Sequence, residues 1–162
     1  MPRRPNADSS PDGAPADGRW QLRLLGGFEL RDPQGRVRAI ARRQAQALLA
    51  CLALAAPHRI GRDALVERLW PGAGTATGRN RLRQALAALL AALGADASRL
   101  LDAGRDSVGL AANRLDSDVA RLERLARAGA GRAALAPYAG ELLPGFDDGW
   151  LHDERLRLAA LA

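Results

Sequence analysis

The sequence has 162 residues, 48% of them hydrophobic, which suffices for one ordinary domain and part of a second and excludes a mostly disordered chain. No stretch reaches the ~18 consecutive apolar residues of a membrane span, and the first residues lack the apolar core of a secretory signal. The single cysteine, Cys51, excludes an intramolecular disulfide. These features are typical of a cytoplasmic protein.

Charge is unevenly distributed along the chain. Residues 20–114 carry fifteen arginines and seven acidic residues, a net charge of +8, whereas residues 115–162 carry six arginines and eight acidic residues, a net charge of −2. A basic segment beside a mildly acidic one indicates a polyanionic partner. The sequence contains no lysine, however, and the solvated surface of a protein from an arginine-rich proteome explains the charge equally well.

The first elements are a tail and a small sheet. Residues 1–19 are rich in Pro, Gly, Asp and Ser and are predicted to be a disordered tail. Residues 20–40 contain short apolar runs that predict an antiparallel sheet. Asp32-Pro33-Gln34-Gly35 is a turn sequence, and Gly26-Gly27 marks a break between the first two strands.

Three helices follow. Apolar residues recur at helical spacing over residues 42–56 and 62–70, and each stretch is closed by a proline. The third predicted helix, residues 77–94, places Leu82, Leu86, Leu89 and Leu93 on one face. Its opposite face is polar at the N-terminal end only, where it carries Thr77, Asn80, Arg81 and Gln84, with Arg83 on the flank.

That polar face has the residue types that read DNA. A helix in the major groove contacts bases with its first turns. Arginine fits guanine N7 and O6, and asparagine or glutamine fits adenine N6 and N7. The same residue types are common on solvated helix ends, so the neighbouring elements must be considered before DNA binding is inferred from this face.

The surroundings are a preceding helix and a following hairpin. Residues 99–110 form two apolar runs around Ala103-Gly104-Arg105-Asp106, which predicts a β-hairpin with Arg105 at its tip. Helix starts bind phosphates through backbone N–H groups. We therefore predict phosphate contacts, with ordinary surface arginines as the alternative, at Arg42, Arg43, Arg62 and Arg83.

The remaining sequence is helical. A helix is predicted to begin within residues 115–129, with Ser117 or Asp118 as its cap, and alanine-rich helix follows from about Arg132. The final residues have the pattern of an amphipathic helix that continues to the end of the chain, which leads us to expect a truncated helical segment.

Two stretches resemble modules of one family. "LRLLGGFELRDPQGRV", the "RLWP" that ends the second helix and the "RNRLRQAL" of the third resemble the winged-helix DNA-binding domain of Streptomyces antibiotic regulatory proteins (SARP), in the OmpR/PhoB-like class. "DSDVARLERL" and "YAGELLPGFDDGWLHDERLRL" resemble the start of the bacterial transcriptional activation domain (BTAD) that follows it. Together they cover residues 20–162.

The resemblance implies an α+β winged helix at residues 20–114, with an N-terminal antiparallel sheet, three helices and a C-terminal wing hairpin, before an all-α, tetratricopeptide-like segment at residues 115–162. It implies a transcriptional activator that binds double-stranded promoter DNA, on direct repeats as a dimer or as adjacent protomers, and that contacts RNA polymerase. The DNA-facing positions it implies are Thr77, Asn80, Arg81, Arg83 and Gln84, with Arg105 in the wing. Residues 1–18 are too short for a receiver domain, so control by aspartyl phosphorylation is not expected within this chain.

Catalytic and metal sites are not expected. Cys51 lies in an apolar run, His58 and His152 are far apart in sequence, and the acidic cluster at residues 147–154 fits a solvated surface better than a calcium loop. The sequence thus predicts neither an enzyme nor a bound cofactor. The alternative function is a winged-helix protein–protein interaction module without DNA binding.

Overall fold

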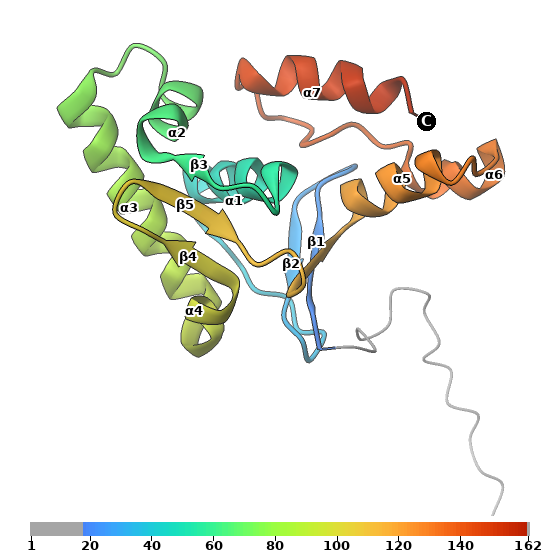
Figure 1. The fold of residues 1–162 in the computed structure, drawn as a ribbon, viewed down its shortest axis with the longest axis horizontal. Helices are drawn as coiled ribbons and strands as arrows, with labels where there is room; N and C mark the ends of the chain where they lie inside the picture. Colours follow the sequence, from blue (N-terminus) through green and yellow to red (C-terminus); the bar gives the residue numbers. More distant parts are fainter. Residues whose placement is uncertain (1–17, 162) are drawn as a thin grey trace, which may run out of the picture.

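The structure, a computed structural model, describes residues 18–161, so the tail predicted for residues 1–19 lies almost wholly outside the described residues. The helix and strand order places two small sheets among several helices (Figure 1). The elements, with the short 3-10 helices labelled η, are β1 (Trp20–Arg23), β2 (Glu29–Arg31), α1 (Arg43–Ala55), β3 (Ile60–Gly61), α2 (Arg62–Leu69), α3 (Thr75–Leu93), η1 (Gly94–Asp96), α4 (Ala97–Leu100), β4 (Leu101–Ala103), β5 (Ser107–Leu110), β6 (Leu115–Ser117), α5 (Asp118–Arg127), α6 (Arg132–Leu135), η2 (Ala136–Tyr138) and α7 (Trp150–Ala159).

The first sheet combines strands from distant parts of the sequence. β1 and β2 pair antiparallel, with Leu22 opposite Leu30, as the apolar pattern predicts. β6 adds to the other edge of β1 in the parallel direction, which gives the strand order β2-β1-β6. After the predicted turn at residues 32–35, the sheet predicted for residues 20–40 continues only as one bridge between Arg31 and Val37.

A C-terminal segment also pairs with the chain that follows β1. Leu25 and Leu142 form an antiparallel bridge, and the Leu143 N–H donates to the Leu24 carbonyl at 2.8 Å. Gly140 permits this approach, because a Cβ there would lie 2.8 Å from the backbone nitrogen of Gly26. A C-terminal segment therefore lies against the chain at the end of β1, beside the N-terminal sheet.

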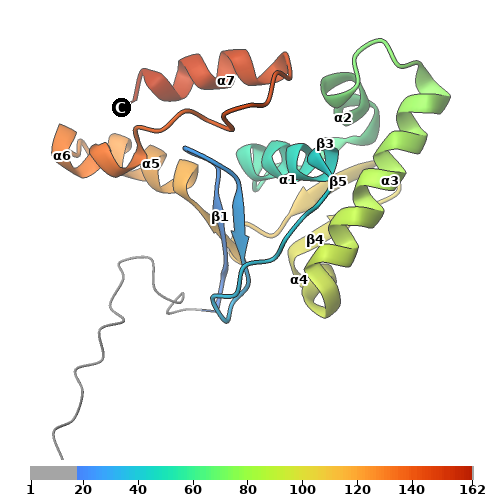
Figure 2. The same ribbon diagram turned by 180° about the vertical axis from the view of Figure 1, so that it is seen from behind.

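The three predicted helices form close to their expected bounds. α1 runs through the middle of the molecule, where Leu48, Leu49 and Leu52 are fully buried. α3 crosses one side of it, and α5 and α6 lie on the other side, as Figures 1 and 2 show from opposite directions. The buried stripe of α3 is the predicted one, Leu82, Leu86, Leu89 and Leu93.

The second sheet contains the predicted hairpin. β4 and β5 pair antiparallel around the turn at residues 104–106, and the two-residue strand β3 pairs with the outer edge of β5. The hairpin lies beside α3 in both ribbon views (Figures 1 and 2).

The C-terminal helices differ from the prediction in length. Ser117 caps α5, since its hydroxyl accepts a hydrogen bond from the Ala120 N–H at 3.0 Å. The helix expected from Arg132 ends at Leu135, because the chain turns into η2 at Pro137, which has no N–H to continue an α-helix. α7 forms where the final helix is predicted, but it ends at Ala159 and does not continue through the last described residues.

The two predicted modules share one sheet. The boundary predicted between residues 114 and 115 falls immediately before β6, which pairs with β1. Both carboxylate oxygens of Asp118 accept hydrogen bonds from the Leu24 and Leu25 N–H groups at 2.8–3.0 Å. Asp118, the first residue of α5, thereby attaches the helical segment to the chain that follows β1. Across residues 18–161 no helix is both long and apolar enough to cross a membrane.

Candidate nucleic-acid interface

The N-terminal half of α3 presents a polar surface to solvent. The helix begins at Thr75, after Gly74, whose φ of 77° is a conformation that glycine adopts without strain. The side chains predicted to face bases are all exposed: Thr77, Asn80, Arg81 and Gln84. They share a surface without large apolar side chains, as direct readout of base edges requires.

The buried face of α3 fixes the direction of this surface. Leu82 and Leu86 pack into the core, and Gly78 is buried where α3 crosses α2. A Cβ at Gly78 would lie 2.2 Å from Cγ1 of Val66, so the two helices meet there at closer range than a side chain permits. This contact sets how far the first turns of α3 stand from α2.

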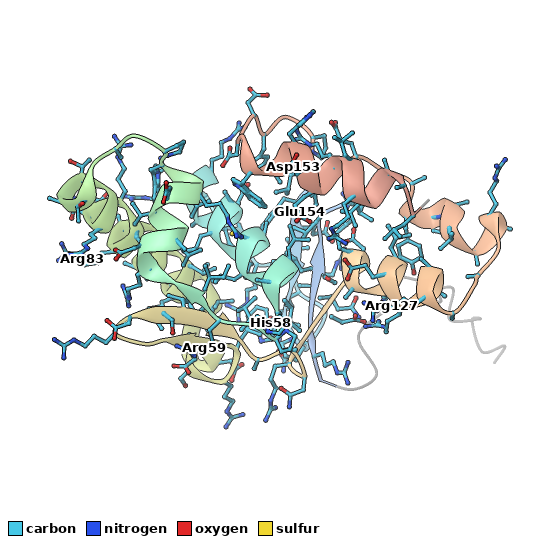
Figure 3. The ribbon with its side chains drawn as sticks, turned by 45° about the horizontal axis from the view of Figure 1, so that its top comes forward. His58, Arg59, Arg83, Arg127, Asp153 and Glu154 are labelled. Atoms are coloured by element: carbon cyan, nitrogen blue, oxygen red, sulfur yellow. The ribbon has the colours of Figure 1, made fainter. Side chains whose placement is uncertain are left out.

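A groove separates α3 from the hairpin turn. It has a volume of about 360 Å³ and is lined by Arg62, Asp63, Arg79, Leu82, Arg83, Arg105 and Asp106. Four guanidinium groups and two carboxylates give the lining an excess of positive charge. Arg83 lies on the outer side of α3, at the same end of the molecule as the hairpin turn (Figure 3). Charge and concavity make this groove suited to bind a phosphate.

Arg79 was missing from the sequence prediction. It lies one helical turn before Arg83 and lines the same groove. Its Nη2 lies 3.5 Å from Oδ1 of Asp63, in a pair whose side chains are 59% and 80% exposed. Such an exposed ion pair contributes little to the stability of the fold, and it leaves the guanidinium available to an anion. The i, i+4 spacing with Arg83 was the signal that could have identified it.

Arg62 and Arg105 lie on the hairpin side of the groove. Nε of Arg62 donates to the Gly104 carbonyl at 2.9 Å, and the Arg62 N–H donates to the Asp106 carbonyl at 2.8 Å. Arg105, between these two acceptor residues, is exposed at the tip. Arg62 therefore supports the turn as well as lining the groove.

Arg42 and Arg43 do not line this groove, and the structure gives Arg43 a different contact from the predicted phosphate. Nη2 of Arg43 donates to the Gly145 carbonyl, and the guanidinium carbon lies 4.2 Å from the centre of the Phe146 ring. This is a cation–π contact between the start of α1 and the segment that leads into α7. Arg42 precedes α1 and is exposed.

The cysteine and the acidic residues outside the groove lie in environments that do not indicate catalysis or metal binding. Burial raises the pKa of the Cys51 thiol, against the lowering effect of Arg68, whose Nη1 lies 3.7 Å from the sulfur. A buried thiol with a raised pKa is a poor nucleophile. Glu154 pairs with Arg157 at 2.8 Å, and both Glu154 and Asp153 lie on α7 (Figure 3). Within residues 18–161 no three His, Cys, Asp or Glu side chains gather where they could hold a metal ion.

Comparison with known proteins identifies a similar fold. No family model and no curated protein matches the sequence. Among solved structures the chain is similar to Mycobacterium tuberculosis EmbR in complex with a low-affinity phosphopeptide, with a TM-score of 0.68 and 22% sequence identity. The match covers 88% of this chain and 42% of the EmbR chain. The likeness shows that the mixed α/β fold of this chain resembles part of the EmbR structure.

Proposed function

We propose that this protein is a sequence-specific DNA-binding transcriptional regulator built on a winged helix. The observation that carries the proposal is the exposed polar half of α3 beside an arginine-lined groove and a hairpin tip. α3 enters the major groove of double-stranded DNA, and the β4–β5 hairpin acts as the wing.

The contacts divide by chemistry. Thr77, Asn80, Arg81 and Gln84 read base edges from the first turns of α3. Phosphates are bound by Arg62, Arg79, Arg83 and Arg105, with Arg105 reaching the minor groove or the backbone from the wing. Arg42, exposed just before α1, adds a phosphate contact at that helix start.

The surface of α3 favours DNA over a protein partner. The large hydrophobic side chains exposed on the described chain are Val37, Leu90 and Leu156. Leu90 is the one that belongs to α3, and it lies in the C-terminal half of the helix. A protein-interaction surface centred on the first turns of α3 would need an apolar patch there, whereas the residues present are polar or basic.

The wider role follows from the family resemblance and from the fold shared with EmbR. The protein acts as an activator in the cytoplasm and binds promoter DNA at direct repeats as a dimer or as adjacent protomers. The helical segment at residues 115–162 belongs to a tetratricopeptide-like activation domain and offers a surface to RNA polymerase. Neither a cofactor nor catalysis forms part of this role.

A selection from random duplexes tests the proposal. The protein is titrated with a pool of random double-stranded DNA at two salt concentrations, and the bound fraction is sequenced. We expect an enriched motif and an affinity that falls steeply with salt. Salt-sensitive binding without a motif would contradict sequence-specific recognition, and no binding at low salt would favour the protein-interaction module.

A matched pair of variants locates the interface. Arg81 and Arg99 are both exposed arginines, the first on the proposed reading face of α3 and the second on α4. Arg81→Ala should lose the preference for the enriched motif, whereas Arg99→Ala should retain it. An equal effect of the two substitutions on motif preference would contradict a reading face on α3.

A further inference from the structure

Arg59 lies beside the hairpin (Figure 3) and is not among the residues that line the groove. Its Nη1 donates to Oδ2 of Asp102 at 2.6 Å, and its Nη2 donates to the Asp102 carbonyl at 3.4 Å. Its Nε donates to the Ser107 hydroxyl, and Nη2 also donates to the Ser107 carbonyl, both at 2.8 Å. One guanidinium thus connects β4 to the first residue of β5.

Two glycines make room for this side chain. A Cβ at Gly104 would lie 2.8 Å from Nη2 of Arg59, and a Cβ at Gly109 would lie 2.9 Å from its Cγ. Neither glycine has the positive φ that by itself favours glycine. Arg59 thus passes close over both glycines, and at Gly104 the Ser107 carbonyl oxygen, 3.0 Å from the same Cβ position, limits the space as well.

The turn is held from a second side by Arg62. The carbonyl groups of Gly104 and Asp106, the two neighbours of Arg105, accept hydrogen bonds from the Arg62 side chain and backbone. Arg105 is consequently an exposed side chain on a turn whose flanking residues are both anchored.

The hairpin needs such support. β4 and β5 have three and four residues, and β3 adds two more. A hairpin this short is marginally stable in water by itself and depends on contacts with the rest of the protein. A wing that must be ordered on binding loses affinity through the entropy of ordering, whereas a pre-ordered wing does not.

We propose that Arg59 is a positioning residue of the DNA-binding site: it holds the hairpin in place so that Arg105 meets the nucleic acid, and it does not contact the nucleic acid itself. This inference rests on the proposed function. The competing explanation is that Arg59, whose side chain is 40% exposed, is itself a phosphate contact.

A double-mutant cycle in the full chain separates these explanations. The probe is the duplex enriched from the random pool, or the unselected pool if no motif is enriched. We expect Arg105→Ala and Arg59→Ala each to weaken binding roughly tenfold. Arg59→Ala added to Arg105→Ala should change affinity less than twofold, because its effect passes through Arg105. Additive losses would overturn the proposal.

Arg59→Lys provides the matched control for charge. Lysine retains the positive charge, but its compact ammonium group cannot reproduce the fork of a guanidinium that spans both strands. The variant should therefore lose nearly as much affinity as Arg59→Ala. Wild-type affinity in Arg59→Lys would show that charge alone matters and would overturn the positioning role.

Hydrogen exchange of the free protein supplies a readout that needs no DNA. Arg59→Ala and Arg59→Lys should accelerate exchange in β4 and β5 by about tenfold or more and leave α1 and α3 unchanged. Unchanged exchange in the hairpin would overturn the proposal even if affinity fell. If the wild-type protein binds no duplex, the proposed function fails, and exchange still decides whether Arg59 orders the hairpin.

Discussion

Gly78 of α3 lies directly against Val66 of α2, with room for neither a methyl group nor a longer side chain. A Cβ at Gly78 would lie 2.2 Å from Cγ1 and 3.5 Å from Cβ of Val66. Valine in a helix has one strongly preferred side-chain rotamer, so the clash cannot be relieved by a simple rotation. The contact sets the distance at which α2 crosses α3, the helix that carries the proposed reading face.

Gly78→Ala should therefore destabilise the protein, although alanine is the better helix former by about 1 kcal/mol. Overpacking of this kind costs about 1–3 kcal/mol and should appear as a lower midpoint in urea denaturation. In a Val66→Ala background, where the clash is removed, the same Gly78→Ala change should become stabilising. A Gly78→Ala protein more stable than wild type would contradict the close contact.

Gln84→Ala should relax base preference at one position of the enriched motif. If Gln84 makes a bidentate contact with adenine, the change removes about 1–3 kcal/mol of discrimination. The measurement is the relative affinity for duplexes that differ at single positions. Gln34→Ala, at an exposed glutamine in the turn after β2, is the control and should leave discrimination unchanged. Unchanged discrimination in Gln84→Ala would remove this residue from the reading face.

Arg42→Ala and Arg43→Ala should have different effects despite their adjacency. Arg42 is exposed, so its loss should weaken binding to all sequences and lower the salt slope by about one. Arg43 is engaged with Gly145 and Phe146, so its loss should lower thermal stability and leave the salt slope unchanged. A lowered salt slope in Arg43→Ala at unchanged stability would restore the phosphate contact expected from the sequence.

Asp32 should stabilise the protein above about pH 4 and lose that contribution in acid. Burial by itself raises the pKa of this carboxyl, but hydrogen bonds from the Arg36 and Gln34 N–H groups and from Arg38 outweigh it and lower the pKa below its ordinary value. The folded state therefore binds fewer protons than the unfolded state as pH falls below about 4.

Unfolding measured against pH checks this prediction. The stability difference between wild type and Asp32→Asn should be largest near neutral pH and should shrink as pH falls through the lowered pKa. Burial raises the pKa of Asp118, so this residue changes the pH dependence of stability in the direction opposite to Asp32. Both wild type and Asp32→Asn retain Asp118, so its contribution cancels in the difference between them. A difference that is constant with pH would contradict the lowered pKa of Asp32.

Local sequence patterns predicted most of the helices, the hairpin and the Ser117 cap. Each depends on residues close in sequence: apolar spacing for α1 and α3, turn residues for the hairpin and a short polar side chain for the cap. The buried stripe of α3 and the exposure of Asn80 and Gln84 follow from the same helical period.

Contacts between distant residues were not predictable in this way. The pairing of β1 with β6 and the bridge between Leu25 and Leu142 join segments roughly a hundred residues apart, and nothing in either segment specifies its partner. Arg43 was predicted to contact phosphate, and no role was predicted for Arg59. Their acceptors in the structure are Gly145 for Arg43 and Asp102 with Ser107 for Arg59. The residue type shows that both side chains are positively charged, but it does not show which groups they contact in the fold.

The shared sheet has a consequence for synthesis on the ribosome. α1, α2, α3 and the hairpin contact one another within one continuous stretch of chain, and such local contacts form early. β1, although translated before these elements, gains its parallel neighbour only when Leu115–Ser117 has emerged. The chain after β1 gains its bridge only when Leu142 has followed. The nascent protein therefore completes its proposed DNA-reading half first and carries an unpaired N-terminal strand edge until the helical segment arrives.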